Sequence, residues 1–139
     1  MTVSPEERDT SIAHLIRVRP DLVEIRYKAG STLGGPELTE VQEARRALMG
    51  ERPYATLTII PEDVDFQLGA MSIDHGKLDR SQGLLIATAV VCRANMIEML
   101  TKLYFSYFPQ MHRILVTDKE TEARAWMVGQ LEENAKTGS

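Results

Sequence analysis

The segment from residue 84 to residue 131 constrains the fold more than any other part of the chain. It opens with the apolar run LLIATAVVC, continues into an apolar-rich helical segment, and then reads RILVTD and the amphipathic ETEARAWMVGQL. A short apolar run is typical of a buried strand, and apolar residues at helical spacing are typical of an amphipathic helix. The order strand, helix, strand, helix therefore predicts a parallel α/β layer.

The pattern before this segment predicts a hairpin, a helix and one more strand. Residues 12–18 and 22–28 alternate in polarity around an Arg-Pro-Asp turn, which predicts two antiparallel strands with one wet face. A capping box at Thr39 and a stop at Gly50 predict the helix, and PYATLTII at 53–60 predicts a buried strand. We expect one domain over residues 12–133, between polar tails at 1–11 and 134–139.

Composition and charge exclude several classes of protein. The chain has 139 residues, which is enough for one domain with its own core. Its net charge is −4 and no basic block is present, so nucleic acid is not the expected partner. The polar N-terminus lacks the layout of a signal peptide, and the longest apolar run is about half of a membrane span. We therefore expect a cytoplasmic protein without a membrane span.

The residues that commonly carry chemistry do not form a recognisable constellation. Ser72, Asp74 and His75 are near neighbours on one predicted loop, whereas a catalytic triad converges from different elements. The single cysteine, Cys92, lies inside an apolar run and is expected to be a buried, inert thiol. The histidines lie far apart in the sequence, without metal-ligand spacing: His14, His75 and His112. We assign no catalytic residue, no cofactor and no metal, and expect a protein that is not an enzyme.

Three segments together resemble a small bacterial STAS/SpoIIAA-like domain. They are PYATLTII, LLIATAVVCRANMIEMLTKLYFSYFP and RILVTDKETEARAWM, and in the last of them Ala123 and Trp126 match inward-facing positions of the final helix. The resemblance covers most of residues 12–133 in order. It implies an α/β fold with a mixed five-stranded sheet and helices packed mainly on one face.

The best-known members of that family are anti-anti-sigma factors. They bind a kinase-like anti-sigma partner and are switched by phosphorylation of a Ser or Thr after the third strand, because the phosphate adds negative charge at the contact surface. This chain departs from that motif, since PEDVDF follows Ile60 and the nearest hydroxyl is Ser72. The resemblance implies a regulatory, protein-interaction module without the phosphorylation switch. Its expected partner-contact loop contains Glu62, Asp63, Asp65 and Ser72.

The helical segment after residue 92 carries more apolar side chains than one core-facing stripe requires. Met99, Phe105 and Phe108 lie off that stripe, which predicts an interface and a homodimer. Burial of both faces of this helix within one compact domain explains the same pattern. A second function class remains open, in which the helix and neighbouring strands enclose a pocket for a lipid acyl chain or another apolar ligand.

Overall fold

The computed structural model describes residues 6–66, 85–96 and 113–137. The helices are α1 (Gly35–Met49) and α5 (Glu120–Thr137), and a short 3₁₀ turn, η1, spans Ala94–Met96. The strands are β1 (Glu7–Asp9), β2 (Ala13–Arg19), β3 (Leu22–Tyr27), β4 (Thr32–Leu33), β5 (Tyr54–Ile59), β6 (Asp65–Phe66), β7 (Leu85–Val91) and β8 (Arg113–Thr117).

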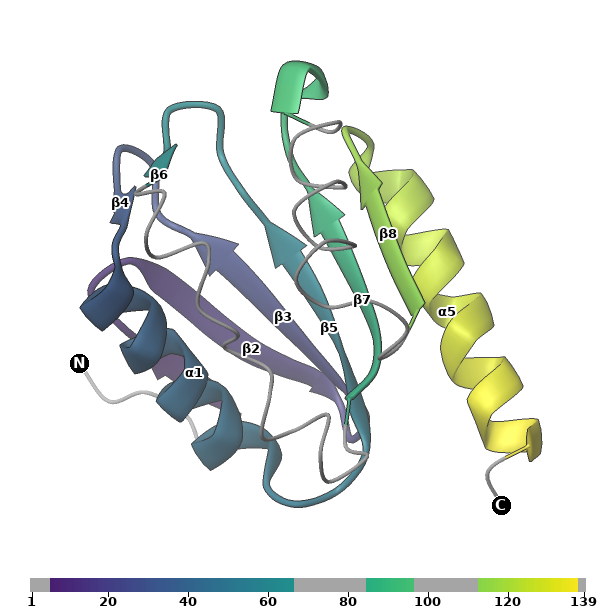
Figure 1. Cartoon of the computed structure of the whole chain (residues 1–139). Helices are drawn as coiled ribbons and strands as arrows, with labels where there is room; N and C mark the ends of the chain where they lie inside the picture. The colour runs from purple at the N-terminus through teal and green to yellow at the C-terminus, as the bar shows by residue number, and fades with distance from the viewer. Residues whose placement is uncertain (1–5, 67–84, 97–112, 138–139) are drawn as a thin grey trace.

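The strands form a mixed six-stranded sheet in the order β1-β2-β3-β5-β7-β8 (Figure 1). β1 pairs antiparallel with β2, and β2 antiparallel with β3, whereas β3, β5, β7 and β8 run parallel to one another. β4 and β6 form a separate two-stranded parallel sheet, in which Thr32 pairs with Asp65 and Leu33 with Phe66. The parallel layer predicted from residues 84–131 is confirmed, because β7 pairs directly with β8.

The main sheet has six strands where five were predicted. The additional strand, β1, lies in residues 1–11, which we expected to be a polar tail. Its sequence, Glu-Arg-Asp, lacks apolar alternation because β1 is an edge strand with little to bury. At the other end, α5 continues to Thr137, beyond the predicted end of the domain.

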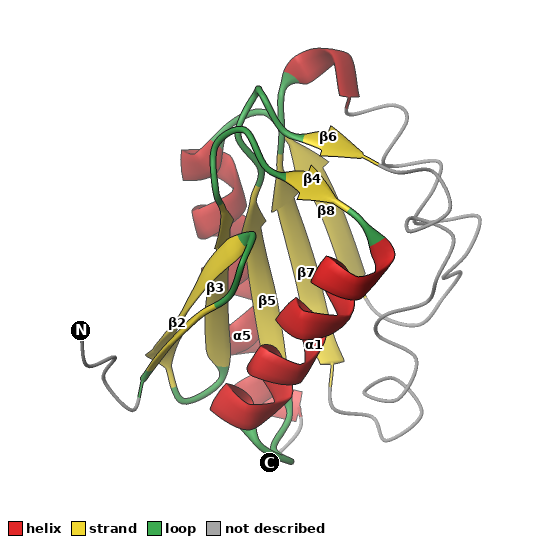
Figure 2. Ribbon diagram, turned by 90° about the vertical axis from the view of Figure 1, so that its left-hand side faces the viewer, coloured by secondary structure: helices red, strands yellow, loops and turns green. Residues whose placement is uncertain are grey.

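The two described helices lie on opposite faces of the sheet (Figure 2). The segment expected to form another helix falls mostly within residues 97–112, outside the described residues, so the concentration of helices on one face stays a prediction. None of the helices in the described part of the chain is long and apolar enough to cross a membrane.

Two separate apolar cores occupy the two faces of the sheet. β3 contributes to both, with Val23 and Ile25 packed beneath α1 and Leu22 packed beneath α5. Successive side chains of a strand point to opposite faces, so a strand covered on both sides needs apolar residues at adjacent positions. The α5 side adds alternate small and branched residues from β5 and β7: Ala55, Leu57, Ala87, Ala89 and Val91.

The first helix ends where the sequence predicts, although it begins earlier. α1 starts at Gly35 with Pro36 in its first turn, and the Thr39 hydroxyl donates to the Gly35 carbonyl oxygen (3.0 Å) instead of capping the helix. Gly50 ends the helix with a φ of 71°, and its amide donates to the Arg46 carbonyl oxygen (2.9 Å). Positive φ favours glycine, which explains the stop at this position.

Candidate functional site

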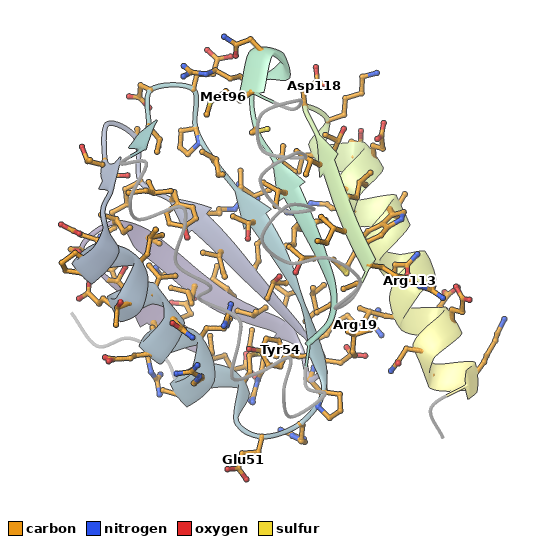
Figure 3. The ribbon with its side chains drawn as sticks, in the orientation of Figure 1. Arg19, Glu51, Tyr54, Met96, Arg113 and Asp118 are labelled. Atoms are coloured by element: carbon orange, nitrogen blue, oxygen red, sulfur yellow. The ribbon has the colours of Figure 1, made fainter. Side chains whose placement is uncertain are left out.

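The segments that follow the parallel strands meet at one end of the sheet, which we call the carboxyl edge: residues 28–31, 60–64, 92–96 and 118–119. Met96 and Asp118 lie at this end, and Glu51 lies at the opposite end (Figure 3). Open α/β sheets bind their ligands outside the carboxyl ends of their strands. The carboxyl edge is therefore the first place to look for a functional site.

An exposed acidic pair projects from the loop after β5. The Ile60 amide donates to the Val91 carbonyl oxygen (2.8 Å), and Val64 is only 2% exposed, so both ends of the loop are anchored. Glu62 and Asp63 lie between these anchors and are exposed. The chain thus presents two carboxylates on a fixed support.

Two neighbouring segments hold the acidic loop in place. The Arg93 guanidinium, just after β7, donates a hydrogen bond to the backbone carbonyl oxygen of Glu62. Gly30, in the turn after β3, has a φ of 74°, and a Cβ built there would lie 3.8 Å from Asp63 Oδ2. The Asp63 carboxylate therefore lies beside that turn, so the loops after β3, β5 and β7 are neighbours.

Cys92 lies beneath this edge and confirms the prediction of a buried thiol. Its amide donates to the Thr117 carbonyl oxygen (2.9 Å), which extends the pairing of β7 with β8 by one residue. Burial raises the pKa of the Cys92 thiol, Asp118 raises it further, and Arg93 acts in the opposite direction. A protonated, buried thiol is a poor nucleophile, so this cysteine serves the core.

The sequence Thr117-Asp118-Lys119-Glu120 fits a capping box with Thr117 as the N-cap, whereas the last helix begins two residues later, at Glu120. The Ala123 amide donates to the Lys119 carbonyl oxygen (3.1 Å), which makes Lys119 the N-cap of α5. The Thr117 hydroxyl instead accepts the Lys119 amide (3.1 Å) within the preceding turn. Because Ser and Thr form such local bonds readily, a Thr-x-x-Glu pattern does not by itself place the helix start.

An ion network ties α5 to β3 close to the carboxyl edge. Oε1 of Glu24, a side chain only 7% exposed, lies 2.6 Å from Arg26 Nε and 3.0 Å from Arg124 Nη2. Glu120 Oε2 lies 2.9 Å from Arg124 Nε and 3.3 Å from Arg26 Nη2. The hydrogen bond from Arg124 is the main reason that the pKa of Glu120 is lowered.

Sequence reasoning missed this network because it placed Glu24 on a wet face. That face is wet for an isolated hairpin, but β3 is an interior strand and Arg124 reaches over it from α5. The available signal was the spacing of Glu120 and Arg124, four residues apart on one helix. It indicates a pair on the helix and says nothing of a third member from a strand far away in the sequence.

Only part of the predicted site falls within the described residues. Glu62 and Asp63 are exposed at the carboxyl edge, and Asp65 lies in β6, where its backbone pairs with Thr32. Four predicted site residues lie outside the described ranges: Ser72, Met99, Phe105 and Phe108. Among the residues that the structure describes, no three His, Cys, Asp or Glu side chains are grouped so that they could hold a metal ion.

A small hollow lies between β8 and α5, away from the carboxyl edge. Its lining is mostly polar: Ile86, Arg113, Gln130, Glu133 and Asn134. Two of the lining residues, Arg113 and Glu133, pair through Nη1 and Oε2 (2.7 Å). An acyl chain requires a largely apolar cavity, so this hollow does not suit one.

The sheet order and the two described helices define a SpoIIAA-like fold, which confirms the resemblance seen in the sequence. The structure is similar to the crystal structure of an uncharacterised protein of the DUF3478 family from Shewanella loihica PV-4, which has a SpoIIAA-like fold. The two share 17% sequence identity with a TM-score of 0.57, over 91% of this chain and 99% of the other. No protein-family model matches the sequence, and no curated protein matches it either.

Proposed function

We propose that this chain is a non-enzymatic interaction module that binds a protein partner through its carboxyl edge. The observation that carries the proposal is the exposed pair Glu62 and Asp63, presented between the buried Val64 and the paired Ile60. A loop held at both ends loses little conformational entropy when a partner binds it. The loop is therefore better suited to binding a partner than to presenting charges to solvent alone.

The chemistry of the loop indicates what kind of partner fits. In SpoIIAA-like regulators, phosphorylation supplies the negative charge after the third strand of the family's domain, whereas here two carboxylates occupy the corresponding loop. A carboxylate carries its charge without any modification, so contact with the partner would not depend on phosphorylation. A basic surface, such as one on a kinase-like anti-sigma regulator, would complement it.

The absence of enzymatic activity is part of the proposal. Cys92, the single cysteine of the chain, lies at the carboxyl edge but is buried, and its pKa is raised. A catalytic nucleophile needs access to substrate and a base that activates it. No cofactor is invoked, and the cytoplasmic location expected from the sequence stays a prediction.

Two further expectations from the sequence remain predictions. A homodimer through Met99, Phe105 and Phe108 concerns residues outside the described ranges. Binding of a lipid or acyl chain is the alternative function, and the polar hollow at Arg113 and Glu133 gives it no support.

Site-specific photo-crosslinking in the organism of origin tests the proposal. A benzoylphenylalanine residue replaces Lys119, which is exposed at the carboxyl edge, so that Glu62 and Asp63 stay intact. The matched control carries the same probe at Glu51, which is exposed at the opposite end of the sheet. We expect one discrete adduct with another protein from position 119 and none of that mass from position 51.

A second chain combines the probe at position 119 with Glu62→Gln and Asp63→Asn. Loss of the adduct in this chain supports recognition through the acidic pair. An adduct of unchanged yield, or no adduct specific to position 119, would overturn the proposal. An adduct with the mass of two copies of the chain would instead place self-association at this edge.

A further inference from the structure

The two outermost strands of the main sheet differ in how their outer sides are protected. β1 and β8 lie at opposite ends of the strand order, so within the described part of the chain each pairs with another strand on one side only (Figure 1). The outer side of such a strand presents a row of amide and carbonyl groups that can pair with a further strand. Charged side chains are a common protection against this pairing.

β1 is protected by its own side chains. The Arg17 amide donates to the Glu6 carbonyl oxygen (2.8 Å), so Glu6 faces β2 and the next residue, Glu7, directs its backbone groups outward. The Arg8 guanidinium donates to that outward Glu7 carbonyl oxygen (2.8 Å) and so occupies it. All three residues of the strand, Glu-Arg-Asp, are charged. A second strand would have to displace the Arg8 hydrogen bond before it could pair here.

β8 lacks this protection. Its sequence is Arg-Ile-Leu-Val-Thr, in which the only charge lies on the first residue, and its three central residues are each partly exposed. The apolar core beneath α5 is built from residues of β3, β5 and β7, and Leu115 of β8 lies outside it. β8 therefore lies at the margin of α5 and not beneath it. A partly exposed apolar strand at the side of a sheet readily pairs with another strand.

The pairing of β7 with β8 shows which backbone groups of β8 face outward. The Cys92 amide donates to the Thr117 carbonyl oxygen (2.9 Å), so Thr117 directs its backbone groups toward β7. Successive residues of a strand direct these groups to alternate sides. Leu115 therefore also faces β7, whereas Ile114 and Val116 each turn an amide and a carbonyl oxygen outward.

This outward pattern is complementary to itself. When two copies of β8 run antiparallel about a twofold axis at Leu115, Ile114 of each copy lies across from Val116 of the other. All the outward amides then meet outward carbonyl oxygens, as in an ordinary antiparallel ladder. The cross-strand side-chain pairs are apolar, with leucine opposite leucine and isoleucine opposite valine, and such pairs stabilise a sheet.

The charges at the two ends of β8 agree with the same arrangement. Arg113, whose side chain is 56% exposed, begins the strand, and the exposed Asp118 follows its end. Antiparallel pairing places the cationic end of each strand beside the anionic end of the other. The same operation on β1 would set Arg8 opposite Arg8 and Glu7 opposite Asp9, where like charges repel. Charge therefore favours self-pairing at β8 and opposes it at β1.

We propose that this chain forms a homodimer in which the outer sides of two β8 strands pair antiparallel and join the two main sheets into one. This surface differs from the homodimer interface predicted from the sequence, which consists of Met99, Phe105 and Phe108. The two β8 strands point in opposite directions, so the two carboxyl edges lie at opposite ends of the joined sheet. Partner binding at the carboxyl edge and dimerisation through β8 can therefore each fail without the other.

Proline substitutions on the full chain test which side of β8 is used. Light scattering after size exclusion should give the mass of two chains for the unmodified protein, falling toward one chain on dilution. Val116→Pro removes an outward amide and spares the ladder with β7, because an outermost strand accepts proline where its N–H faces outward. We expect this variant to keep its circular dichroism spectrum and to have the mass of one chain. Leu115→Pro is the matched control, and its loss of an amide that faces β7 should lower the urea midpoint of unfolding.

A cysteine at position 115 measures the pairing independently. Two copies of Leu115 lie directly opposite at a position without hydrogen bonds, where Cα atoms are about 4.5 Å apart and a disulfide can form. With oxidised glutathione, Leu115→Cys should become a covalent dimer on a non-reducing gel. The unmodified chain, whose Cys92 is buried, should not. Val18→Cys, at a position on β2 that is 45% exposed, is the control for random collision.

The covalent dimer from Leu115→Cys, together with the mass of one chain in Val116→Pro, supports the proposal. The mass of one chain for the unmodified protein at every concentration would overturn it. A dimer that persists in folded Val116→Pro would also overturn it. If Val116→Pro does not fold, the disulfide decides: a dimer that gives no more covalent product from position 115 than from position 18 is joined through another surface.

Discussion

Arg124 on α5 places its Nη2 atom 3.0 Å from Oε1 of Glu24, which lies one hundred residues earlier on β3. The carboxylate is nearly buried, and the guanidinium is 40% exposed. The helix therefore covers a negative charge on the sheet with a positive charge of its own, while part of the Arg124 side chain stays exposed to solvent.

Removing this cover should destabilise the fold. We expect Arg124→Met to lower the free energy of unfolding by about 1 kcal/mol, because Glu24 keeps Arg26 but loses one of two charged donors in a mostly dehydrated place. Urea unfolding followed by circular dichroism measures the change. Arg113→Met is the matched control, since Arg113 pairs with Glu133 at the surface, and its unfolding midpoint should stay close to that of the unmodified chain. Equal losses of stability in both variants would show that the pair of Arg124 with Glu24 contributes no more than a surface ion pair.

Two glycines should respond in opposite directions to the same substitution. Gly50 ends α1 with φ 71° and ψ −150°, a region used almost only by glycine, so Gly50→Ala should cost about 1–3 kcal/mol. Gly129 lies inside α5, and a Cβ built there meets nothing within 4 Å, so Gly129→Ala should stabilise the chain by about 0.5–1 kcal/mol. Thermal unfolding of both variants measures whether each substitution raises or lowers the stability. A loss of stability in Gly129→Ala would show that this helix face is packed against something.

The stability of the chain in acid should depend on Glu120. Its pKa is lowered in the folded protein, first by the hydrogen bond from Arg124 and also by Arg26. A lowered pKa in the folded state adds stability above the pKa of the unfolded chain, and that stability is lost as the pH falls through the folded value. In Glu120→Gln, the difference between unfolding midpoints at about pH 6 and pH 3 should therefore be smaller than in the unmodified chain.

The exposed Glu122, in the same turn of α5, provides the control for that titration. Glu122→Gln should leave the difference between the two unfolding midpoints nearly unchanged. If both variants reduce the difference between the two unfolding midpoints equally, the effect comes from the net charge of the chain and not from the ion network.

Cys92 should react with thiol reagents only when the structure opens. Burial both blocks access and raises the pKa of the thiol, so little thiolate forms near neutral pH. Reaction with dithionitrobenzoate should be complete within minutes in urea and at least tenfold slower in the folded chain. Equal rates in the two conditions would show that the carboxyl edge opens readily.

Much of the fold could be predicted from the sequence because the strands are marked by their own composition. The apolar runs at 54–59 and 85–91 are strands, and the amphipathic segment from residue 120 is a helix, as their periodicities indicate. β1 was missed because three charged residues on an edge strand carry no apolar signal. The start of α5 was misplaced because Thr117 bonds its own turn.

The sequence predicts the exposed residues of the candidate site but not the contacts that surround them. The exposure of Glu62 and Asp63 follows from their charge and from the loop signal at Pro61. The contact of Arg93 with this loop and the burial of Glu24 depend on which strands become neighbours. One sequence does not encode that adjacency in any local pattern.

The alternation along β3 gives Glu24 a role in strand registration. Its neighbours Val23 and Ile25 belong to the core under α1, and Glu24 itself faces Arg124 on the other side. A slip of one residue would turn Glu24, together with Arg26 of the same strand, toward the aliphatic core under α1 and leave Arg124 facing a valine or an isoleucine. Burying these charges in an apolar core without Arg124 is costly, so the two charged residues on this face of β3 disfavour the nearest misaligned sheet.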